Sequence, residues 1–251
     1  MERLFIAFSF LAGLVCNSVH ANPIDDNCPK LTYKHAPAAT ADQYICHKEY
    51  AVALSYKTRN PIYTTEYLSA SHIGNLPRTN DFKADPEVPV EYAVQPTEYV
   101  HTICHGERCD RGHMTPDKDF SSCAVCIHES FYMSNMVPQN KGNNEQIWKH
   151  LEMDIRSYVV QHGPVYVITG PVYGNNPDHI GNGIAVPDGL FKVAIDSKTG
   201  KSTAFMMLNE DIPTDTLPER EVKLADVEAA AGITFDNSLD KQTIGALDIF
   251  H

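Results

Sequence analysis

Residues 110–114 read Asp-Arg-Gly-His-Met, and residues 134–148 read Ser-Asn-Met-Val-Pro-Gln-Asn-Lys-Gly-Asn-Asn-Glu-Gln-Ile-Trp. These two stretches decide the fold and the chemistry of the chain. His113 supplies an imidazole, the side chain whose ordinary pKa suits proton transfer near neutral pH. Asn144, thirty-one residues further on, supplies an amide oxygen of the kind that Mg²⁺ accepts as a ligand. A base and a metal ligand together predict a metal-assisted catalytic site.

A long helix is predicted from residue 143 to residue 162. Its apolar residues recur with helical spacing, namely Ile147, Trp148, Leu151, Ile155, Tyr158 and Val159. Asn143 or Asn144 is expected to cap its start, and Gly-Pro at 163–164 to end it. Each step of four residues turns about 40° around the axis, so Trp148 and Glu152 follow Asn144 along one side. We expect Trp148 to pack in the core because of its large apolar area.

Strands are predicted before and after this helix. Residues 51–56 and 62–68 have strand composition with a turn at 57–61, residues 75–98 are mostly loop, and 130–136 is a short strand. After the helix, 165–170 is a buried strand, and 189–195 pairs with 202–208 as a hairpin. This order predicts an α+β fold around a mixed or antiparallel sheet. No repeat or linker divides residues 22–251, so a single domain is expected.

The first 21 residues have the features of a secretory signal peptide. A charged start precedes an apolar run from Leu4 to Cys16, and small residues lead to Ala21. The run is too short to span a membrane comfortably. We therefore expect cleavage after Ala21, a mature chain without a membrane anchor, and a secreted or periplasmic location.

Six cysteines follow that cleavage point: Cys28, Cys46, Cys104, Cys109, Cys123 and Cys126. An even number in an exported protein predicts disulfides, and short separations favour Cys28–Cys46, Cys104–Cys109 and Cys123–Cys126. A zinc site from the last four is the competing interpretation. The two close pairs flank His113, so oxidation either shapes the loops around the base or staples the chain by about 2–4 kcal/mol per bridge.

The chain is acidic, with a formal net charge of −12. Residues 208–251 carry ten acidic and three basic residues, which places −7 of the −12 there. The rest of the chain is not basic either. Long-range attraction to nucleic acid normally comes from clustered Lys and Arg, so binding of phosphates would need local cations and a metal ion.

The two opening stretches resemble the active site of the DNA/RNA non-specific endonucleases, a family of secreted bacterial nucleases and the mitochondrial endonuclease. Two further segments are similar to that family. Residues 76–86 read Leu-Pro-Arg-Thr-Asn-Asp-Phe-Lys-Ala-Asp-Pro, and residues 166–173 read Tyr-Val-Ile-Thr-Gly-Pro-Val-Tyr. The resemblance covers roughly residues 50–210. It implies the ββα-metal nuclease fold, with a central sheet and a long helix that carries the metal ligand.

The resemblance also implies roles for the site residues. His113 takes the proton of the attacking water as general base. Asn144 binds Mg²⁺, with Mn²⁺ as a substitute, and the acid Glu152 steadies the water shell of the metal. Arg78 and Arg111 hold the phosphate, because a guanidinium grips two of its oxygens.

Asn135 matches a family position near the site, where it orients the base or the ligand loop. Each site residue also has an ordinary structural interpretation. Asn144 is a helix cap, Glu152 a solvent-facing acid, Arg78 part of a surface ion pair, and Arg111 the partner of Asp110 or Glu107. Asp110 is expected to fix the loop, Gly112 to relieve a tight backbone, and Gln139 to be structural.

The implied function is an exported Mg²⁺-dependent endonuclease that hydrolyses DNA and RNA with little sequence specificity and leaves 5′-phosphate ends. Contacts to the phosphate backbone carry no sequence information. The protein would act as a monomer or homodimer. The alternative is a catalytically silent protein on the same scaffold that binds nucleic acid or a partner. A zinc-stapled exported metalloprotein with an unrelated activity is the third interpretation.

Overall fold

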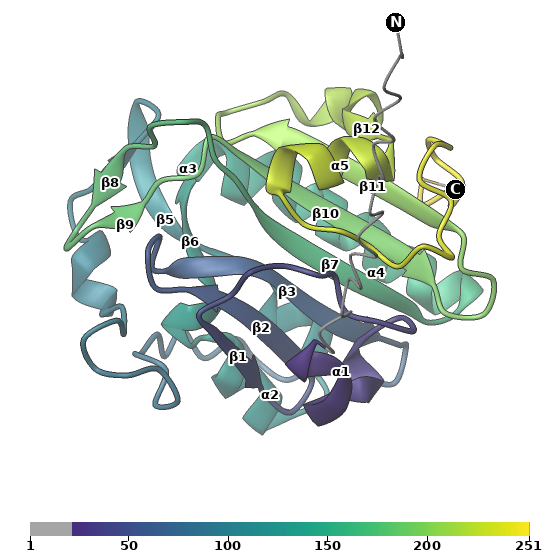
Figure 1. Ribbon diagram of the computed structural model, residues 1–251, viewed down its shortest axis with the longest axis horizontal. Helices are drawn as coiled ribbons and strands as arrows, with labels where there is room; N and C mark the ends of the chain where they lie inside the picture. Colours follow the sequence, from purple (N-terminus) through teal and green to yellow (C-terminus); the bar gives the residue numbers. More distant parts are fainter. Residues whose placement is uncertain (1–21, 251) are drawn as a thin grey trace, which may run out of the picture.

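A seven-stranded sheet forms the centre of the computed structural model, which describes residues 22–250 (Figure 1). Its strands lie in the order β1-β2-β3-β7-β10-β11-β12, and every neighbouring pair is antiparallel. The predicted mixed or antiparallel sheet is therefore antiparallel. The signal peptide predicted at 1–21 lies outside the described residues. Within residues 22–250 no helix has both the length and the apolar character needed to cross a membrane.

Three sheets contain all the strands of the described residues. The main sheet holds β1 (Gln43–Cys46), β2 (Tyr50–Ser55), β3 (Asn60–Leu68), β7 (Val165–Val172), β10 (Gly189–Asp196), β11 (Ser202–Leu208) and β12 (Glu221–Val222). A three-stranded sheet holds β4 (Ile103–Cys104), β5 (Glu107–His113) and β6 (Met136–Asn140). The third is the pair β8 (His179–Ile180) and β9 (Ile184–Ala185).

The helices cover both faces of the main sheet. They are α1 (Pro23–Asn27), α2 (Ala124–Ser130), α3 (Lys141–Asn143), α4 (Lys149–His162) and α5 (Leu224–Ala231). A π-helical turn, Asn144–Trp148, joins α3 to α4. In Figure 1, α5 and α1 lie in front of the sheet and α4 lies behind it.

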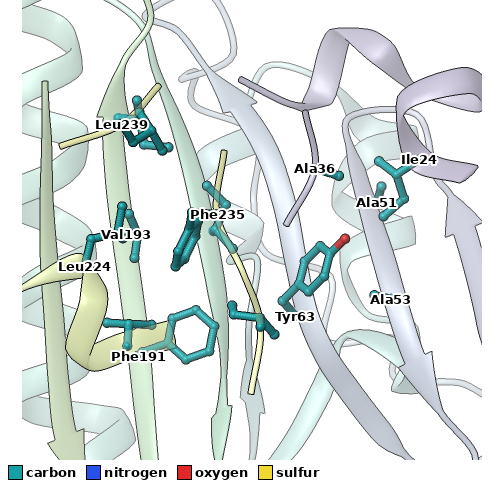
Figure 2. Packing of buried hydrophobic residues seen from close by; sticks show 14 of the residues in the cluster. Ile24, Ala36, Ala51, Ala53, Tyr63, Phe191, Val193, Leu224, Phe235 and Leu239 are labelled. Atoms are coloured by element: carbon teal, nitrogen blue, oxygen red, sulfur yellow. The ribbon is translucent and has the colours of Figure 1, made fainter. Parts of the chain in front are cut away.

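Alternation along the strands builds a core on each face. On β10, Phe191 and Val193 point to the front face and pack with Leu224 and Phe235 from the C-terminal segment (Figure 2). Leu190 and Ala194 point the other way and pack with apolar residues of the α4 face, among them Trp148, Leu151 and Ile155. Because successive side chains of a strand alternate between faces, a strand buried on both faces has an apolar residue at nearly every position.

Most predicted strands are confirmed. Residues 51–56 and 62–68 fall in β2 and β3, 165–170 falls in β7, and the hairpin is formed by β10 and β11. The strand predicted at 130–136 is wrong. Ser130 ends α2, and the chain then turns, held by the Asn135 side chain, which donates to the Ser130 carbonyl at 2.8 Å. Extended structure starts at Met136, where pairing with β5 begins.

The three predicted disulfides are confirmed. Cys28 pairs with Cys46, Cys104 with Cys109, and Cys123 with Cys126. The zinc interpretation is wrong, because these bridges leave none of the six thiolates free to bind a metal. Cys104–Cys109 closes the turn between β4 and β5, and so it lies at the start of the strand that ends at His113.

We predict that Phe235→Ala lowers the free energy of unfolding of the protein. Phe235 is buried in the front core, and truncation of a buried Phe costs about 3–5 kcal/mol. A domain of this size loses about 2–4 °C in Tm per kcal/mol, so thermal unfolding should shift by roughly 10 °C. Ile244→Ala is the control, because Ile244 is half exposed and should change the stability by less than about 0.5 kcal/mol. Equal Tm values for the two variants would contradict the assigned core.

Candidate active site

Two antiparallel strands followed by a helix build the site. Strand β5 pairs with β6 so that His113 lies opposite Met136. The chain leaves β6 at Asn140 and enters α3 directly. The Asn140 side chain accepts a hydrogen bond from the Asn143 backbone N–H at 3.1 Å and caps the helix. The predicted caps, Asn143 and Asn144, are therefore wrong, because the cap is Asn140, three residues before Asn143.

The predicted site residues meet in one cavity of about 630 Å³. The cavity is lined by Arg78, Asn80, Phe82, Asp110, Arg111, His113, Pro116, Asp117, Lys118, Asn144, Glu145, Lys149, Glu152 and Arg156. Five of the six predicted site residues are in this set. The sixth, Asn135, does not line the cavity.

His113 lies in an aromatic and cationic environment. Its side chain packs edge-on against Phe131 at 4.9 Å between ring centres and contacts Phe82 at 5.7 Å. The residue is 7% exposed, and within residues 22–250 its buried Nε2 atom has no hydrogen-bond partner. Burial, reinforced by the charges of Arg78 and Arg111, lowers the pKa of His113 well below its ordinary value of 6.5. The imidazole is thus neutral at neutral pH, the form that accepts a proton.

Both predicted arginines lie over aromatic rings. The Arg78 guanidinium is 4.8 Å from the centre of the Phe131 ring, and that of Arg111 is 4.1 Å from Phe82. Arg78 also forms a salt bridge with Asp117. Arg111 forms no ion pair with Asp110 or Glu107 inside the described part of the chain, where Arg108 pairs with Asp110 instead at 3.2 Å. The rings hold the two cations in place, and both rings also contact His113.

Asp110 orients the side chain of Asn144. The Asn144 Nδ2 donates to Asp110 Oδ2 at 3.0 Å, while Asp110 Oδ1 accepts from Arg108. The amide nitrogen is thereby occupied, and Oδ1 is the atom of Asn144 that is left to bind a cation. Asn144 starts the π-helical turn, a rare helical irregularity that is common at functional sites. Asp110 therefore fixes the orientation of the Asn144 side chain.

Glu152 and Arg156 continue the cavity wall along α4. Burial raises the pKa of Glu152 to about 7, against the opposing influence of the Lys192 and Arg156 charges. Glu152 lines the cavity and is not the solvent-facing acid of the structural interpretation. Arg156 donates to Asp119 at 2.7 Å. Trp148 lies between Asn144 and Glu152 in the sequence, and its side chain is fully buried in the core as predicted.

Asn135 binds the segment that follows His113 and does not line the cavity. It is fully buried, and its side chain accepts from the Thr115 backbone N–H at 3.0 Å and donates to the Thr115 carbonyl at 2.8 Å. Its own carbonyl accepts from the Met114 N–H at 2.9 Å. These bonds hold the two residues that follow His113, which supports an orienting role and excludes direct contact with the cavity.

Gly112 allows a close approach between the two strands of the site. A Cβ at this position would lie 2.0 Å from Gln139 Oε1 and 2.6 Å from Gln139 Cβ. Gln139 cannot move away easily, because it is buried and its Nε2 donates to Asn143 at 2.7 Å. The glycine is thus required by side-chain packing across the strand pair, and Gln139 is structural as predicted.

Sequence reasoning missed several cations of the cavity. Arg156, Lys118 and Lys149 join Arg78 and Arg111 around it. Arg156 could have been found, because it lies four residues after Glu152 and so on the same side of the helix. Lys118 lies in a short helical turn after the base, and no local pattern indicates that this turn faces the cavity. Five basic residues therefore line the cavity, together with four acidic ones, Asp110, Asp117, Glu145 and Glu152.

The cavity offers oxygen ligands to a hard cation. Asn144 contributes an amide oxygen, and the carboxylates of Asp110 and Glu152 line the same cavity. Residues 22–250 contain no cluster of three or more His, Cys, Asp or Glu side chains that could hold a metal ion by itself. Mg²⁺ suits such a site, because it keeps several waters and needs few protein ligands. Zinc does not, because it prefers four nitrogen or sulfur ligands.

Comparison with known proteins gives a consistent result. A family model described as DNA/RNA non-specific endonuclease matches residues 27–242. Nuclease C1 of Cunninghamella echinulata var. echinulata is 32% identical over 232 residues, which cover 83% of this chain and 88% of that protein. A crystal structure of an EndoG/EndoGI complex matches with a TM-score of 0.76 and 27% identity, covering 86% of this chain and 94% of the other. That likeness confirms the α+β ββα-metal nuclease fold.

Other relatives are longer than the matched region. Mitochondrial nuclease EXOG of Homo sapiens is 32% identical over 226 residues, which are 80% of this chain but 59% of that protein. Mitochondrial Nuclease 1 of Schizosaccharomyces pombe is 30% identical over 260 residues, with 92% of this chain and 76% of that protein covered.

These relatives correct one prediction. The secreted or periplasmic location is wrong, because several curated relatives are mitochondrial nucleases. The prediction was based on residues 1–21, which lie outside the described residues. Disulfides require an oxidising environment but do not identify export as the route to it.

We predict that His113 titrates well below pH 6.5 in an NMR experiment without divalent metal. Arg78→Gln should raise the pKa of His113, because loss of a nearby positive charge makes the protonated imidazole easier to form. Arg108→Gln is the control, because Arg108 does not contribute to the His113 shift, and it should leave the titration unchanged. A His113 pKa at or above 6.5, or one that Arg78→Gln does not raise, would contradict the assigned environment.

Proposed function

The chain belongs to the DNA/RNA non-specific endonuclease family, and from this premise we propose a Mg²⁺-dependent endonuclease that hydrolyses phosphodiester bonds of DNA and RNA. The enzyme is a nuclease by family, and the family is metal-dependent. The choice of Mg²⁺, the residue roles and the 5′-phosphate products are our proposal. One observation carries it, namely the single cavity that holds a neutral imidazole, an oriented amide oxygen and two stacked arginines.

His113 is the general base of the proposed reaction. A water molecule that attacks phosphorus must lose a proton, and a neutral imidazole takes it up. Burial and the two arginines keep His113 neutral at and below neutral pH, so the base is in its active form before substrate arrives. Its buried Nε2 makes no hydrogen bond within residues 22–250 that would compete for the proton.

Arg78 and Arg111 bind the phosphate and the negative charge that grows on it. Each guanidinium is held by an aromatic ring, Phe131 or Phe82, and therefore needs little rearrangement when charge develops. Arg78 exchanges part of its contact with Asp117 for the phosphate. Recognition through phosphate oxygens explains the low sequence specificity that we propose, because the backbone is the same at every step.

Asn144 holds the metal ion through Oδ1, and Asp110 keeps that oxygen available by accepting from Nδ2. When bound, Mg²⁺ supplies positive charge for the phosphate and the leaving oxygen. Glu152 lines the same cavity and steadies the water shell of the ion, and Mn²⁺ is a chemically similar substitute. Arg156, fixed by Asp119, adds positive charge on the far side of Glu152.

We predict that His113→Ala abolishes most of the cleavage of both plasmid DNA and RNA. Loss of a general base lowers kcat by about 10²–10⁴-fold, and EDTA should stop the parent enzyme completely. His35→Ala is the matched control, because His35 lies on the exposed surface beside Asp25 and should keep the parent rate. Cleavage by His113→Ala at the parent rate, with the same products, would remove His113 from the mechanism.

We predict that Asn144→Ala raises the Mg²⁺ concentration needed for half-maximal activity. Changes to the groups around a bound metal weaken its binding by about 10–100-fold, and loss of the ligand itself should reach at least that range. Isothermal titration with Mg²⁺ in the absence of nucleic acid gives an independent readout. The control is Asn237→Ala at an exposed turn. Unchanged Mg²⁺ binding by Asn144→Ala would show that the ion binds elsewhere.

A further inference from the structure

Lys192 is a buried basic residue that does not line the active-site cavity, and the reaction proposed above gives it no role. It lies on β10, in the middle of the main sheet, and is 1% exposed. Lysine is almost never fully buried unless it is paired, because removal of an ammonium group from water costs several kcal/mol. An apolar residue would be more favourable at this position, because Lys192 shares its face of the strand with Leu190 and Ala194.

Lys192 contacts the segment that follows His113 and the helical turn that starts at Asn144. Its Nζ donates to the Met114 carbonyl at 3.2 Å, and Met114 directly follows His113. The same Nζ lies 5.1 Å from the centre of the Trp148 ring, in the π-helical turn that starts at Asn144. One ammonium group therefore contacts the strand end that carries the base and the helical turn that carries the metal ligand.

The remaining contacts fix Lys192 itself. Nζ also donates to Thr169 Oγ1 at 2.8 Å, on the neighbouring strand β7 and directly opposite in register. Glu66 on β3 belongs to the same face of the sheet and is 1% exposed, with no hydrogen-bond partner for either carboxylate oxygen within residues 22–250. Burial raises the pKa of Glu66, and the charge of Lys192 opposes this rise, as it does for Glu152.

We propose that Lys192 is a positioning residue of the nuclease site, which sets the placement of His113 relative to Asn144 through the Met114 carbonyl and the Trp148 ring. This inference rests on the proposed function. Met114 N–H and Thr115 are held by Asn135, so Lys192 completes the set of bonds on this short segment. Without it, the Met114 carbonyl is left unpaired in the core and the segment can shift.

A small shift is enough to lower the rate. Catalysis needs the base and the metal-bound phosphate in a defined geometry, and displacement by about 1 Å can cost about 100-fold. Substrate contacts, by comparison, do not involve Lys192, which does not line the cavity. A positioning role therefore predicts a loss in kcat with little change in KM. A purely structural role predicts a loss of stability alone.

The test separates the two roles with charge-balanced double variants. Lys192→Met keeps the length of the side chain and removes the charge and the donor, but it leaves Glu66 as a buried acid with only Arg156 as a nearby cation. Lys192→Met/Glu66→Gln removes both charges, and Lys192→Met/Glu66→Leu replaces the pair by apolar groups, which often keeps or improves stability. Thr169→Val is the matched control, because it removes one acceptor of Lys192 and leaves the contacts to Met114 and Trp148 in place.

We expect Lys192→Met to unfold at a lower temperature than the parent and to cleave DNA with kcat lowered by about 10–100-fold, the range seen when groups that orient a metal site are removed. At least one double variant should recover the parent Tm, yet its kcat should stay low and its KM should lie within about twofold of the parent. Thr169→Val should lose stability and keep the parent kcat.

Three results would overturn the proposal. The first is a folded Lys192 variant with the parent kcat. The second is recovery of kcat together with Tm in a double variant, because that makes Lys192 a stabiliser only. The third is failure of both double variants to fold, which would show that Lys192 serves the fold. An inactive parent enzyme would instead reject the proposed function, so the two failures are distinguishable.

Discussion

The antiparallel pairing of β5 with β6 is the constraint on which the active site depends. It brings His113, at the end of one strand, beside the strand that leads into the helix with Asn144. The pairing is close at Gly112, where any side chain would meet Gln139. Asn140 then ends the strand and caps the helix in a single residue, so that no loop separates them. An imidazole and an amide that are far apart in sequence are thereby brought to one cavity by backbone geometry.

Electrostatics in this protein are local. The chain has a net charge of −12, and an acidic protein gains little from long-range attraction to phosphates. The cavity nevertheless contains Arg78 and Arg111, each held by an aromatic ring, and Arg156, held by Asp119. The same arginines suppress protonation of His113. In the proposed reaction these two arginines also bind the phosphate, so replacing either by a neutral donor would change both phosphate binding and the pKa of His113.

The sequence predicted what depends on local pattern. Trp148 follows the helical spacing, and β10 and β11 alternate around a turn, so both were found. Strand β5 was missed because its residues Glu107 to His113 are mostly polar, and pairing with β6 rather than apolar alternation makes it a strand. The site residues came from motif resemblance, which names Arg78 or Glu152 but says nothing of burial. Asn135 shows the limit, since it matches a motif and yet does not line the cavity.

The burial of Lys192 also could not be predicted from the sequence. A lysine in a strand is normally assigned to the solvent face, because burial of an ammonium group is costly. Here the strand crosses the middle of a sheet that is covered on both faces, so no solvent face exists and the charge must be satisfied inside. The fold meets this demand with Thr169 and the Met114 carbonyl. In the role that we propose for Lys192, its contacts with the Met114 carbonyl and the Trp148 ring link the cost of burying it to the placement of His113 relative to Asn144.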